Sequence, residues 1–375
     1  MARQAPTPSS LQALLEELSR PRAELVERLP DKALRCLACG HRCYLPEGKI
    51  GICKVRRNQG GELYVPWGYV AGLQCDPVEK KPFFHAYPGS LALSFGMLGC
   101  DYHCSYCQNW ITSQALRDPV AGVIPQRVGP EDIVRLARKY GAKIVTSTYN
   151  EPLITSEWAV EIFRHARAAG LVTSYVSNGN ATPEVLAFLR PWVDLYKVDL
   201  KGFDDRHYRK LGGLLETVKR TIRDLVELGF WVEVVTLLVP GFNDSPQELR
   251  ALTEFLASVS PDIPWHVTAF HPDYKMTDRD ATTVEKLLFA ARLGEEAGLR
   301  YVYVGNVPGA VGEYENTRCP QCRHTVVARH GYRILRVDLR DGYCPKCGTQ
   351  IAGRWGDTAH IHQPEGAWWP RPVAL

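Results

Sequence analysis

Two kinds of hydrophobic pattern alternate along the chain between about residues 91 and 304. Short apolar runs rich in β-branched residues are separated by longer stretches with helical spacing. The apolar runs lie at Leu91–Leu98, Lys143–Tyr149, Val172–Ser177, Leu195–Leu200, Trp231–Val239, Trp265–Phe270 and Tyr301–Val304. The stretches with helical spacing lie at Pro130–Tyr140, Ile154–Ala169, Pro183–Leu189, Leu215–Leu228, Gln247–Ser258 and Thr282–Ala297. Several of these stretches are followed by a glycine just before the next apolar run, which is a common helix stop.

This alternation of strands and helices predicts an α/β fold with a parallel sheet. The number of predicted strands favours a partial or complete (β/α) barrel, and a doubly wound open sheet is the alternative. In a barrel, chemistry takes place where the strands end and the loops begin. The polar residues that follow each apolar run are therefore the first candidates for a functional site.

The regions outside this pattern suggest further segments. Leucines at helical spacing near the start, from Leu11 to Leu18, predict a helical arm. We expect a helical arm at 1–30, a cysteine-rich metal-binding extension at 31–90, the barrel at 91–316, a zinc ribbon at 317–352 and a tail at 353–375. In the tail, His360 and His362 are a candidate ligand pair, although two histidines in a loop are usually ordinary polar residues.

Composition excludes several classes of protein. The 375 residues are 45% hydrophobic and 23% charged, which argues against a disordered or collagen-like chain. The net charge of +4 is not concentrated in a basic stripe, so nucleic-acid binding is not expected. We see no secretory signal and no apolar run long enough to span a membrane, and we expect a cytoplasmic protein. In that compartment clustered cysteines more often hold metal than form disulfides.

The twelve cysteines fall into three groups, with Cys75 alone. The first group has the spacing C-x2-C-x3-C-x9-C, and its members are Cys36, Cys39, Cys43 and Cys53. Four thiolates this close in sequence can close a tetrahedral site. The metal at this site could be zinc or a second [4Fe–4S] cluster, and His41 could replace one thiolate.

The last group consists of two C-x2-C knuckles, whose members are Cys319, Cys322, Cys344 and Cys347. A β-rich sequence lies between the knuckles. This arrangement predicts a zinc ribbon with a closed, structural site.

The middle group, Cys100, Cys104 and Cys107, has the spacing C-x3-C-x2-C and directly follows the first predicted strand. Thiolates suit iron–sulfur clusters, and three of them leave one iron of a cubane cluster without a protein ligand. An open iron can bind another molecule. A zinc site completed by His103 is the alternative.

This three-cysteine motif, at the end of the first strand of a (β/α) barrel, resembles the radical SAM signature. The resemblance implies a [4Fe–4S] cluster held by the three cysteines and S-adenosylmethionine (SAM) bound to the open iron. It also implies reductive cleavage of SAM to a 5′-deoxyadenosyl radical that abstracts hydrogen from a substrate. By position, the residues implied to contact SAM are Glu151, Ser177, Asn178 and Asp199. Lys201 and His271 are candidate catalytic residues at other strand ends.

A narrower resemblance rests on motifs in a fixed order. They are the C-x2-C of Cys36 and Cys39, Glu79-Lys-Lys-Pro82 with His85, Gly99-Cys100 to Cys107-Gln-Asn109, Tyr149-Asn-Glu-Pro152, Asp199-Leu-Lys201 and Tyr303-Val-Gly-Asn306. Together they resemble the AmmeMemoRadiSam system radical SAM enzyme, a relative of pyruvate formate-lyase activating enzymes. That family implies a flavodoxin- or ferredoxin-type reductant and companion proteins of the Memo and AMMECR types. A glycyl-radical activase is the alternative among enzymes, and a non-catalytic zinc-binding scaffold is the alternative of another class.

Overall fold

The computed structural model describes residues 8–357, 363 and 371–373. Its centre is a mixed sheet with the strand order β16-β15-β14-β13-β12-β11-β9-β8-β20. The strands are β8 (Gly72–Pro77), β9 (Leu91–Gly96), β11 (Ile144–Ser147), β12 (Val172–Ser177), β13 (Leu195–Asp199), β14 (Trp231–Leu238), β15 (Trp265–Ala269), β16 (Val302–Gly305) and β20 (Arg371–Pro372). All neighbours from β9 to β16 pair in parallel, whereas β8 and β20 add antiparallel strands at one edge. Within the described residues β16 pairs only with β15, so the barrel is partial and one side is open.

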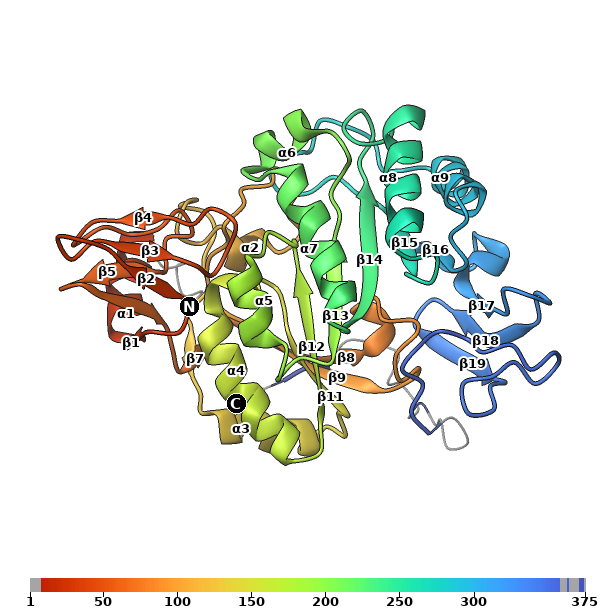
Figure 1. The fold of residues 1–375 in the computed structure, drawn as a ribbon, viewed down its shortest axis with the longest axis horizontal. Helices are drawn as coiled ribbons and strands as arrows, with labels where there is room; N and C mark the ends of the chain where they lie inside the picture. The colour runs from red at the N-terminus through yellow and green to blue at the C-terminus, as the bar shows by residue number, and fades with distance from the viewer. Residues whose placement is uncertain (1–7, 358–362, 364–370, 374–375) are drawn as a thin grey trace, which may run out of the picture.

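Helices connect the parallel strands, as the hydrophobic pattern predicts. They are α3 (Pro130–Lys139), α4 (Ser156–Ala168), α5 (Pro183–Leu189), α7 (Leu215–Glu227), α8 (Pro246–Val259) and α9 (Val284–Glu296). Figure 1 shows α4, α5 and α7 in front of the sheet. The hydroxyl of Thr182 accepts from the Val185 amide (3.1 Å) and caps α5. Gly141, with φ of 70°, ends α3 in the left-handed region that glycine adopts without strain. The predicted α/β fold is confirmed.

The amino-terminal end of the barrel is closed by a segment that we call the floor segment, residues 78–86. Val78, Phe83 and Ala86 of this segment form a buried apolar cluster with residues at the starts of strands β9, β11 and β13. A buried polar layer lies above this floor and includes Lys197, Glu233 and His266. The interior of the barrel is therefore apolar at its base and polar nearer its middle.

The predicted helical arm is only partly helical. Helix α1 (Pro8–Glu17) is followed by strands β1 (Ser19–Arg22) and β2 (Val26–Arg28). Pro21 cannot continue a helix, because it lacks an amide hydrogen, but it fits the edge strand β1. The prediction of one helical segment over residues 1–30 is therefore wrong beyond Glu17.

Two small three-stranded sheets make up most of the N-terminal part, β1-β6-β5 and β2-β3-β4. Their other strands are β3 (Leu34–Cys36), β4 (Tyr44–Leu45), β5 (Arg57–Gln59) and β6 (Glu62–Pro66). Short elements that the hydrophobic pattern did not reveal are η1 (Val78–Lys80), α2 (Trp110–Ser113), η2 (Pro152–Thr155), α6 (Asp205–Leu211), η3 (Gly312–Glu315) and the β7–β10 pair (Tyr69–Val70, Gln126–Arg127). In Figure 1 the N-terminal sheets and the C-terminal module lie on opposite sides of the barrel.

The C-terminal module is an antiparallel sheet of β17 (Thr317–Arg318), β18 (Thr325–His330) and β19 (Arg333–Val337). We call it the ribbon, residues 317–352. The candidate ligands His360 and His362 lie outside the described residues. Among the described helices, none has both the length and the apolar character that crossing a bilayer requires.

Candidate active site

The three central cysteines lie on the loop that leaves β9, at the carboxyl edge of the parallel strands. Cys104 is buried, and Cys100 and Cys107 are half-buried. The Tyr102 amide donates to the sulfur of Cys100 (3.4 Å), and the hydroxyl of Ser113 lies 3.2 Å from the sulfur of Cys107. Hydrogen bonds of this kind are typical of sulfurs that act as thiolate ligands.

Lys201 is a cation that acts through its charge on two of these sulfurs, those of Cys104 and Cys107. Burial raises the pKa of the Cys104 thiol to about 12, and the positive charge of Lys201 opposes that rise. Burial alone would lower the pKa of Lys201, but Asp199 and Cys104 outweigh it, and the pKa stays well above its ordinary value. Lys201 is therefore charged at neutral pH beside the cysteine loop.

Asp199 links Lys201 to the barrel interior. One carboxylate oxygen of Asp199 accepts from Lys201 (3.4 Å), and the other accepts from Lys197. Burial opposes ionisation, but the two lysines hold the pKa of Asp199 below its ordinary value. The two sequence candidates Asp199 and Lys201 thus belong to one charged chain, which also contains Lys197, a residue that the sequence analysis missed.

Glu151 lies on the loop after β11, just before η2, and is almost fully buried. Its carboxylate accepts from the Ser177 hydroxyl (2.7 Å), the Asn178 amide (2.7 Å) and the Leu153 amide (3.1 Å). A carboxylate has about four acceptor positions, so these contacts leave room for one more donor. Burial and the neighbouring Asp101 raise the pKa of Glu151 to about 8. The structure therefore brings three of the predicted SAM contacts into one hydrogen-bonded group.

Asp101 connects this group to the cysteine loop. It is fully buried, directly follows Cys100 and accepts from the side-chain amides of Asn178 and Asn180, both at 2.8 Å. Its backbone carbonyl lies 3.2 Å from Nε2 of His41. The sequence analysis did not select Asp101 or Asn180, and only the position of Asp101 beside Cys100 could have suggested it.

His271 reaches the cysteine loop from the end of β15. Its Nε2 lies 3.0 Å from the side-chain nitrogen of Gln108, the residue after Cys107. Residues after His271 cover the same loop, since Tyr274 stacks on Trp110 with ring centroids 5.2 Å apart. The His271 side chain is exposed to solvent. Its contact with Gln108 places it next to the predicted cluster site.

The N-terminal cysteines lie near one another beside the central loop, but among the described residues only the ribbon cysteines bring all their ligand atoms within 4.8 Å. Gly51 lies between two of the N-terminal cysteines, since a Cβ atom placed on Gly51 would be 3.7 Å from the sulfur of Cys43 and 3.7 Å from that of Cys53. The pKa of Cys39 is raised well above its usual value, mainly by burial. The neighbouring Asp101, Cys36 and Cys53 raise it further. Gly99, which precedes Cys100, lies so close to Cys53 that a Cβ atom on Gly99 would be only 2.9 Å from the Cys53 carbonyl oxygen. The N-terminal cysteines therefore pack against the central loop.

The ribbon cysteines lie close enough to share one ion. Their ligand atoms all lie within 4.8 Å of one another, with 3.5 Å between Cys319 and Cys347 and 3.6 Å between Cys322 and Cys344. A tetrahedral zinc ion places its sulfur ligands about 3.8 Å apart. Hydrogen bonds with Thr349 lower the pKa of Cys347 to about 6, which favours the metal-binding thiolate. These four cysteines could hold a metal, as the predicted ribbon requires.

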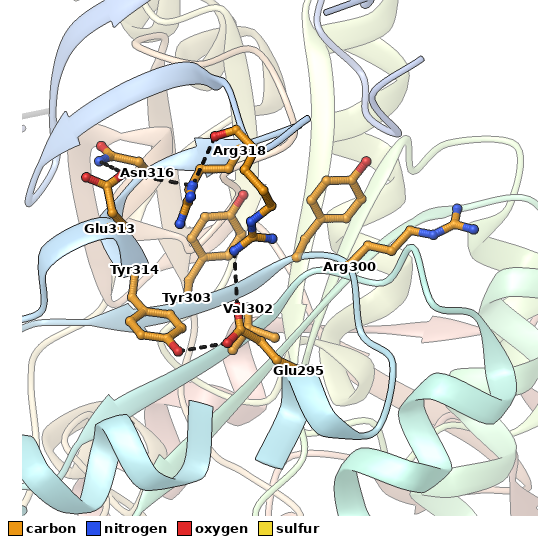
Figure 2. A pocket seen from close by; sticks show the side chains of 10 residues that line it. Glu295, Arg300, Val302, Tyr303, Glu313, Tyr314, Asn316 and Arg318 are labelled. Atoms are coloured by element: carbon orange, nitrogen blue, oxygen red, sulfur yellow. Dashed lines mark hydrogen bonds and ion pairs between the residues drawn. The ribbon is translucent and has the colours of Figure 1, made fainter. Parts of the chain in front are cut away.

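A small polar pocket of about 150 Å³ lies where the ribbon meets α9 and the start of β16 (Figure 2). Its charged groups are already paired. Glu295 accepts from Tyr314 (2.9 Å) and from Arg323 (3.3 Å). Because this pocket adjoins the amino-terminal start of β16 rather than the strand ends, we assign it no part in the chemistry.

Comparison with known proteins relates this arrangement to one family. Residues 96–256 match the family model described as "Radical SAM superfamily". The chain is 38% identical over 334 residues to the uncharacterized protein MJ0808 of Methanocaldococcus jannaschii, covering 88% of this chain and 98% of that protein. It is 25% identical over 232 residues to a pyruvate formate-lyase-activating enzyme of Staphylococcus aureus, covering 56% of this chain and 88% of that enzyme. A solved domain of a pyruvate formate-lyase-activating enzyme from Bacteroides vulgatus is 22% identical, with a TM-score of 0.39 over 43% of this chain and 98% of that domain.

Proposed function

The chain belongs to the radical SAM superfamily and is distantly related to pyruvate formate-lyase-activating enzymes, and we propose that it is the SAM-cleaving enzyme of an AmmeMemoRadiSam system. The observation that carries the catalytic part is the three-cysteine loop at the carboxyl end of the first parallel strand. The non-catalytic scaffold is not retained, because the chain is a radical SAM superfamily enzyme.

The donor set fits a cubane cluster with one open iron. Cys100, Cys104 and Cys107 would hold three irons, and their thiolate charge would be offset by Lys201. When bound, the cluster would supply one electron to SAM, whose cleavage would give methionine and a 5′-deoxyadenosyl radical. Glu151 would accept a hydrogen bond from the SAM amino group at its remaining acceptor position.

The other predicted contacts have supporting roles in this proposal. Ser177 and Asn178 orient the Glu151 carboxylate through their hydrogen bonds. The family resemblance implies that this strand end contacts the ribose of SAM. Asp199 fixes Lys201, and His271 borders the site from the side that is open to solvent.

The test is anaerobic reconstitution of the full chain with iron and sulfide, followed by addition of SAM and a low-potential reductant. We expect 5′-deoxyadenosine to form only when cluster, SAM and reductant are all present. No 5′-deoxyadenosine from protein with a complete cluster would overturn the proposal.

Partner proteins follow from the same proposal. We propose a flavodoxin- or ferredoxin-type reductant and companions of the Memo and AMMECR types. Anaerobic pull-down from the source cell should recover the companions.

The similarity to pyruvate formate-lyase-activating enzymes favours a second candidate, a glycyl-radical activase. In that case co-expression with a glycyl-radical enzyme would give a glycyl electron paramagnetic resonance signal.

We propose that the ribbon binds one zinc ion. Replacing Cys344, which is 1% exposed, with serine should remove about one zinc per chain, because the closed site loses a thiolate ligand. Metal analysis measures this loss. Proteolysis should then cut within residues 317–352 while the barrel stays intact. Unchanged zinc content would contradict the assignment, and Cys75→Ser, which alters a cysteine outside the three groups, is the control.

We propose that the N-terminal cysteines also hold a metal, either zinc or a second [4Fe–4S] cluster. The residues would be Cys36, Cys39, Cys43 and Cys53. Iron and zinc counts per chain after reconstitution distinguish the two metals. About eight irons indicate a second cluster, and about four irons with two zinc ions indicate zinc at both outer sites.

Lys201 gives a prediction about the cluster itself. Lys201→Met should make the reduction potential of the central cluster more negative, because a nearby cation stabilises the more negatively charged reduced form. A tenfold change in the ratio of reduced to oxidised cluster corresponds to about 59 mV for one electron, and we expect a shift of that order. Spectroelectrochemical titration measures it. Lys219→Met, which changes a lysine on α7, should leave the potential unchanged, and a shift toward positive values in Lys201→Met would contradict the assigned role.

A further inference from the structure

A cavity of about 400 Å³ opens between β15, β16 and the ribbon, on the open side of the partial barrel. Its deep end is formed by the floor segment, at Glu79, Pro82 and Phe84. Thr268 and Gly305, near the carboxyl ends of β15 and β16, line it further up. The cavity therefore extends from the barrel floor toward the strand ends, where the cysteine loop lies.

The deep end holds a buried carboxyl group with a free oxygen. Glu79 is fully buried, and its Oε1 accepts from the Gly89 amide (2.8 Å). Its Oε2 has no hydrogen-bond partner among the described residues. Burial raises the pKa of Glu79 to about 7. A buried acceptor without a donor is costly, so this oxygen favours a ligand that brings one.

The neighbouring guanidinium of Arg329 acts on Glu79 through its charge, but it makes no hydrogen bond to the Glu79 carboxylate. The two terminal nitrogens of Arg329, in the ribbon, donate to the Thr317 hydroxyl (2.8 Å) and the Phe84 carbonyl (2.7 Å), and its Nε has no hydrogen-bond partner among the described residues. A second buried carboxylate, Glu233, has its own donors. They are the amides of Phe84 and His85 and the side chains of Trp231 and His266, at 2.7–3.0 Å. The two carboxylates thus share the charge of one guanidinium, that of Arg329, whereas Arg333, which lines the cavity, is exposed.

We propose that this cavity binds the substrate of the radical reaction, and that the substrate carries a protonated primary amine on an apolar chain, with the amine at Glu79. This inference rests on the proposed function, because it places the other end of the substrate near the strand ends. One free oxygen suits the compact ammonium group, whereas a guanidinium would need two parallel acceptors. The apolar side chains of Phe84 and Val304 suit the carbon chain.

Binding of three small probes to the reconstituted full-length protein tests the inference. Pentylamine, pentanol and pentanoate have the same carbon chain and differ only in the terminal group. Isothermal calorimetry should show pentylamine binding at least tenfold more tightly than the other two. A comparison of N-acetyl-lysine methylamide with pentylamine shows whether the cavity prefers the amine of a lysine side chain in a protein or that of a small free molecule. Tighter binding of either one supports the proposal, and equal or tighter binding of pentanoate overturns it.

Glu79→Gln identifies the binding group. The amide can still accept from Gly89, but it replaces the free oxygen with a donor, so pentylamine affinity should fall at least tenfold. Glu313→Gln, in the polar pocket of Figure 2, is the matched control and should bind pentylamine normally. If Glu79→Gln does not fold, Val307→Trp blocks the cavity at another lining residue and should weaken pentylamine binding. Unchanged affinity in the folded variant overturns the inference.

The inference and the proposed function can fail separately. The wild-type protein can be tested for 5′-deoxyadenosine formation without any amine present. If it cleaves SAM but does not prefer pentylamine, only the substrate inference is wrong. If it does not cleave SAM, the proposed function is wrong whatever the cavity binds.

Discussion

Replacing Cys104 with alanine is expected to reduce 5′-deoxyadenosine formation to the background rate. Cys104 is the most buried of the three central cysteines, at 7% exposure, and it lies beside Lys201. Without its thiolate, two protein ligands remain for a cluster that already leaves one iron open. The variant should therefore lose most of its cluster iron as well as its activity.

Iron content, the absorption spectrum and product formation measure this effect on protein reconstituted under argon. Cys75→Ala is the matched control, because Cys75 is equally a free and buried cysteine but lies on β8, outside the three groups. It should retain cluster and product. Product at the wild-type rate from Cys104→Ala would remove the basis for the proposed chemistry, and circular dichroism would show whether both variants are folded.

The strands and helices of the barrel could be predicted because each leaves a local pattern. The runs Val172–Ser177 and Pro183–Leu189 coincide with β12 and α5. Apolar strands of this kind are covered on both faces, so hydrophobicity alone marks them. The antiparallel strands β8 and β20 carried no such mark, since β8 contains Gly72, Gln74 and Asp76 and β20 has only two residues.

The metal ligands were also visible in the sequence, because cysteine spacing is local. The residues around them were not. Asp101 meets Asn178 and Asn180 across 77 and 79 positions, and neither amide has any feature that would select it before the fold is known. Only the topology, which places the end of β12 beside the loop after β9, brings these groups together.

The Glu79-Lys-Lys-Pro82 motif was visible in the sequence, but its position in the fold was not. The sequence identified it as part of the family resemblance but gave it no place. The structure puts Glu79 at the deep end of a cavity, and it places Lys81 against Asp76 and against the hydroxyl of Tyr149 (3.0 Å). A motif can therefore be recognised without any indication of what its side chains face.

Arg56 is the strongest example of a residue that local sequence could not select. It is 1% exposed and forms two parallel hydrogen bonds with Glu157, both at 2.7 Å, across 101 positions of the chain. It also donates to the Ile154 carbonyl (3.1 Å) and to the sulfur of Cys36 (3.2 Å). One buried cation thus joins the N-terminal cysteines to the start of α4.

Arg56→Met is expected to lower the free energy of unfolding by about 3–5 kcal/mol, because it leaves the Glu157 carboxylate buried without a counter-charge. Urea denaturation measures this loss. Adding Glu157→Leu should restore much of the stability, since an apolar pair of similar volume is often as stable as a buried ion pair. Arg57→Met changes the next residue, which is half-buried and donates to the Ser19 hydroxyl (3.2 Å) and the Glu16 backbone carbonyl (3.3 Å). It should cost less than about 1 kcal/mol.

The double variant separates the two roles of Arg56. If Arg56 only neutralises Glu157, the double variant recovers both stability and metal content. If it also supports the thiolate of Cys36, the double variant recovers stability but loses metal at the N-terminal cysteines, because no other described side chain donates to that sulfur. We expect the second result. Retention of the full metal content in Arg56→Met would show that the N-terminal site does not depend on this cation.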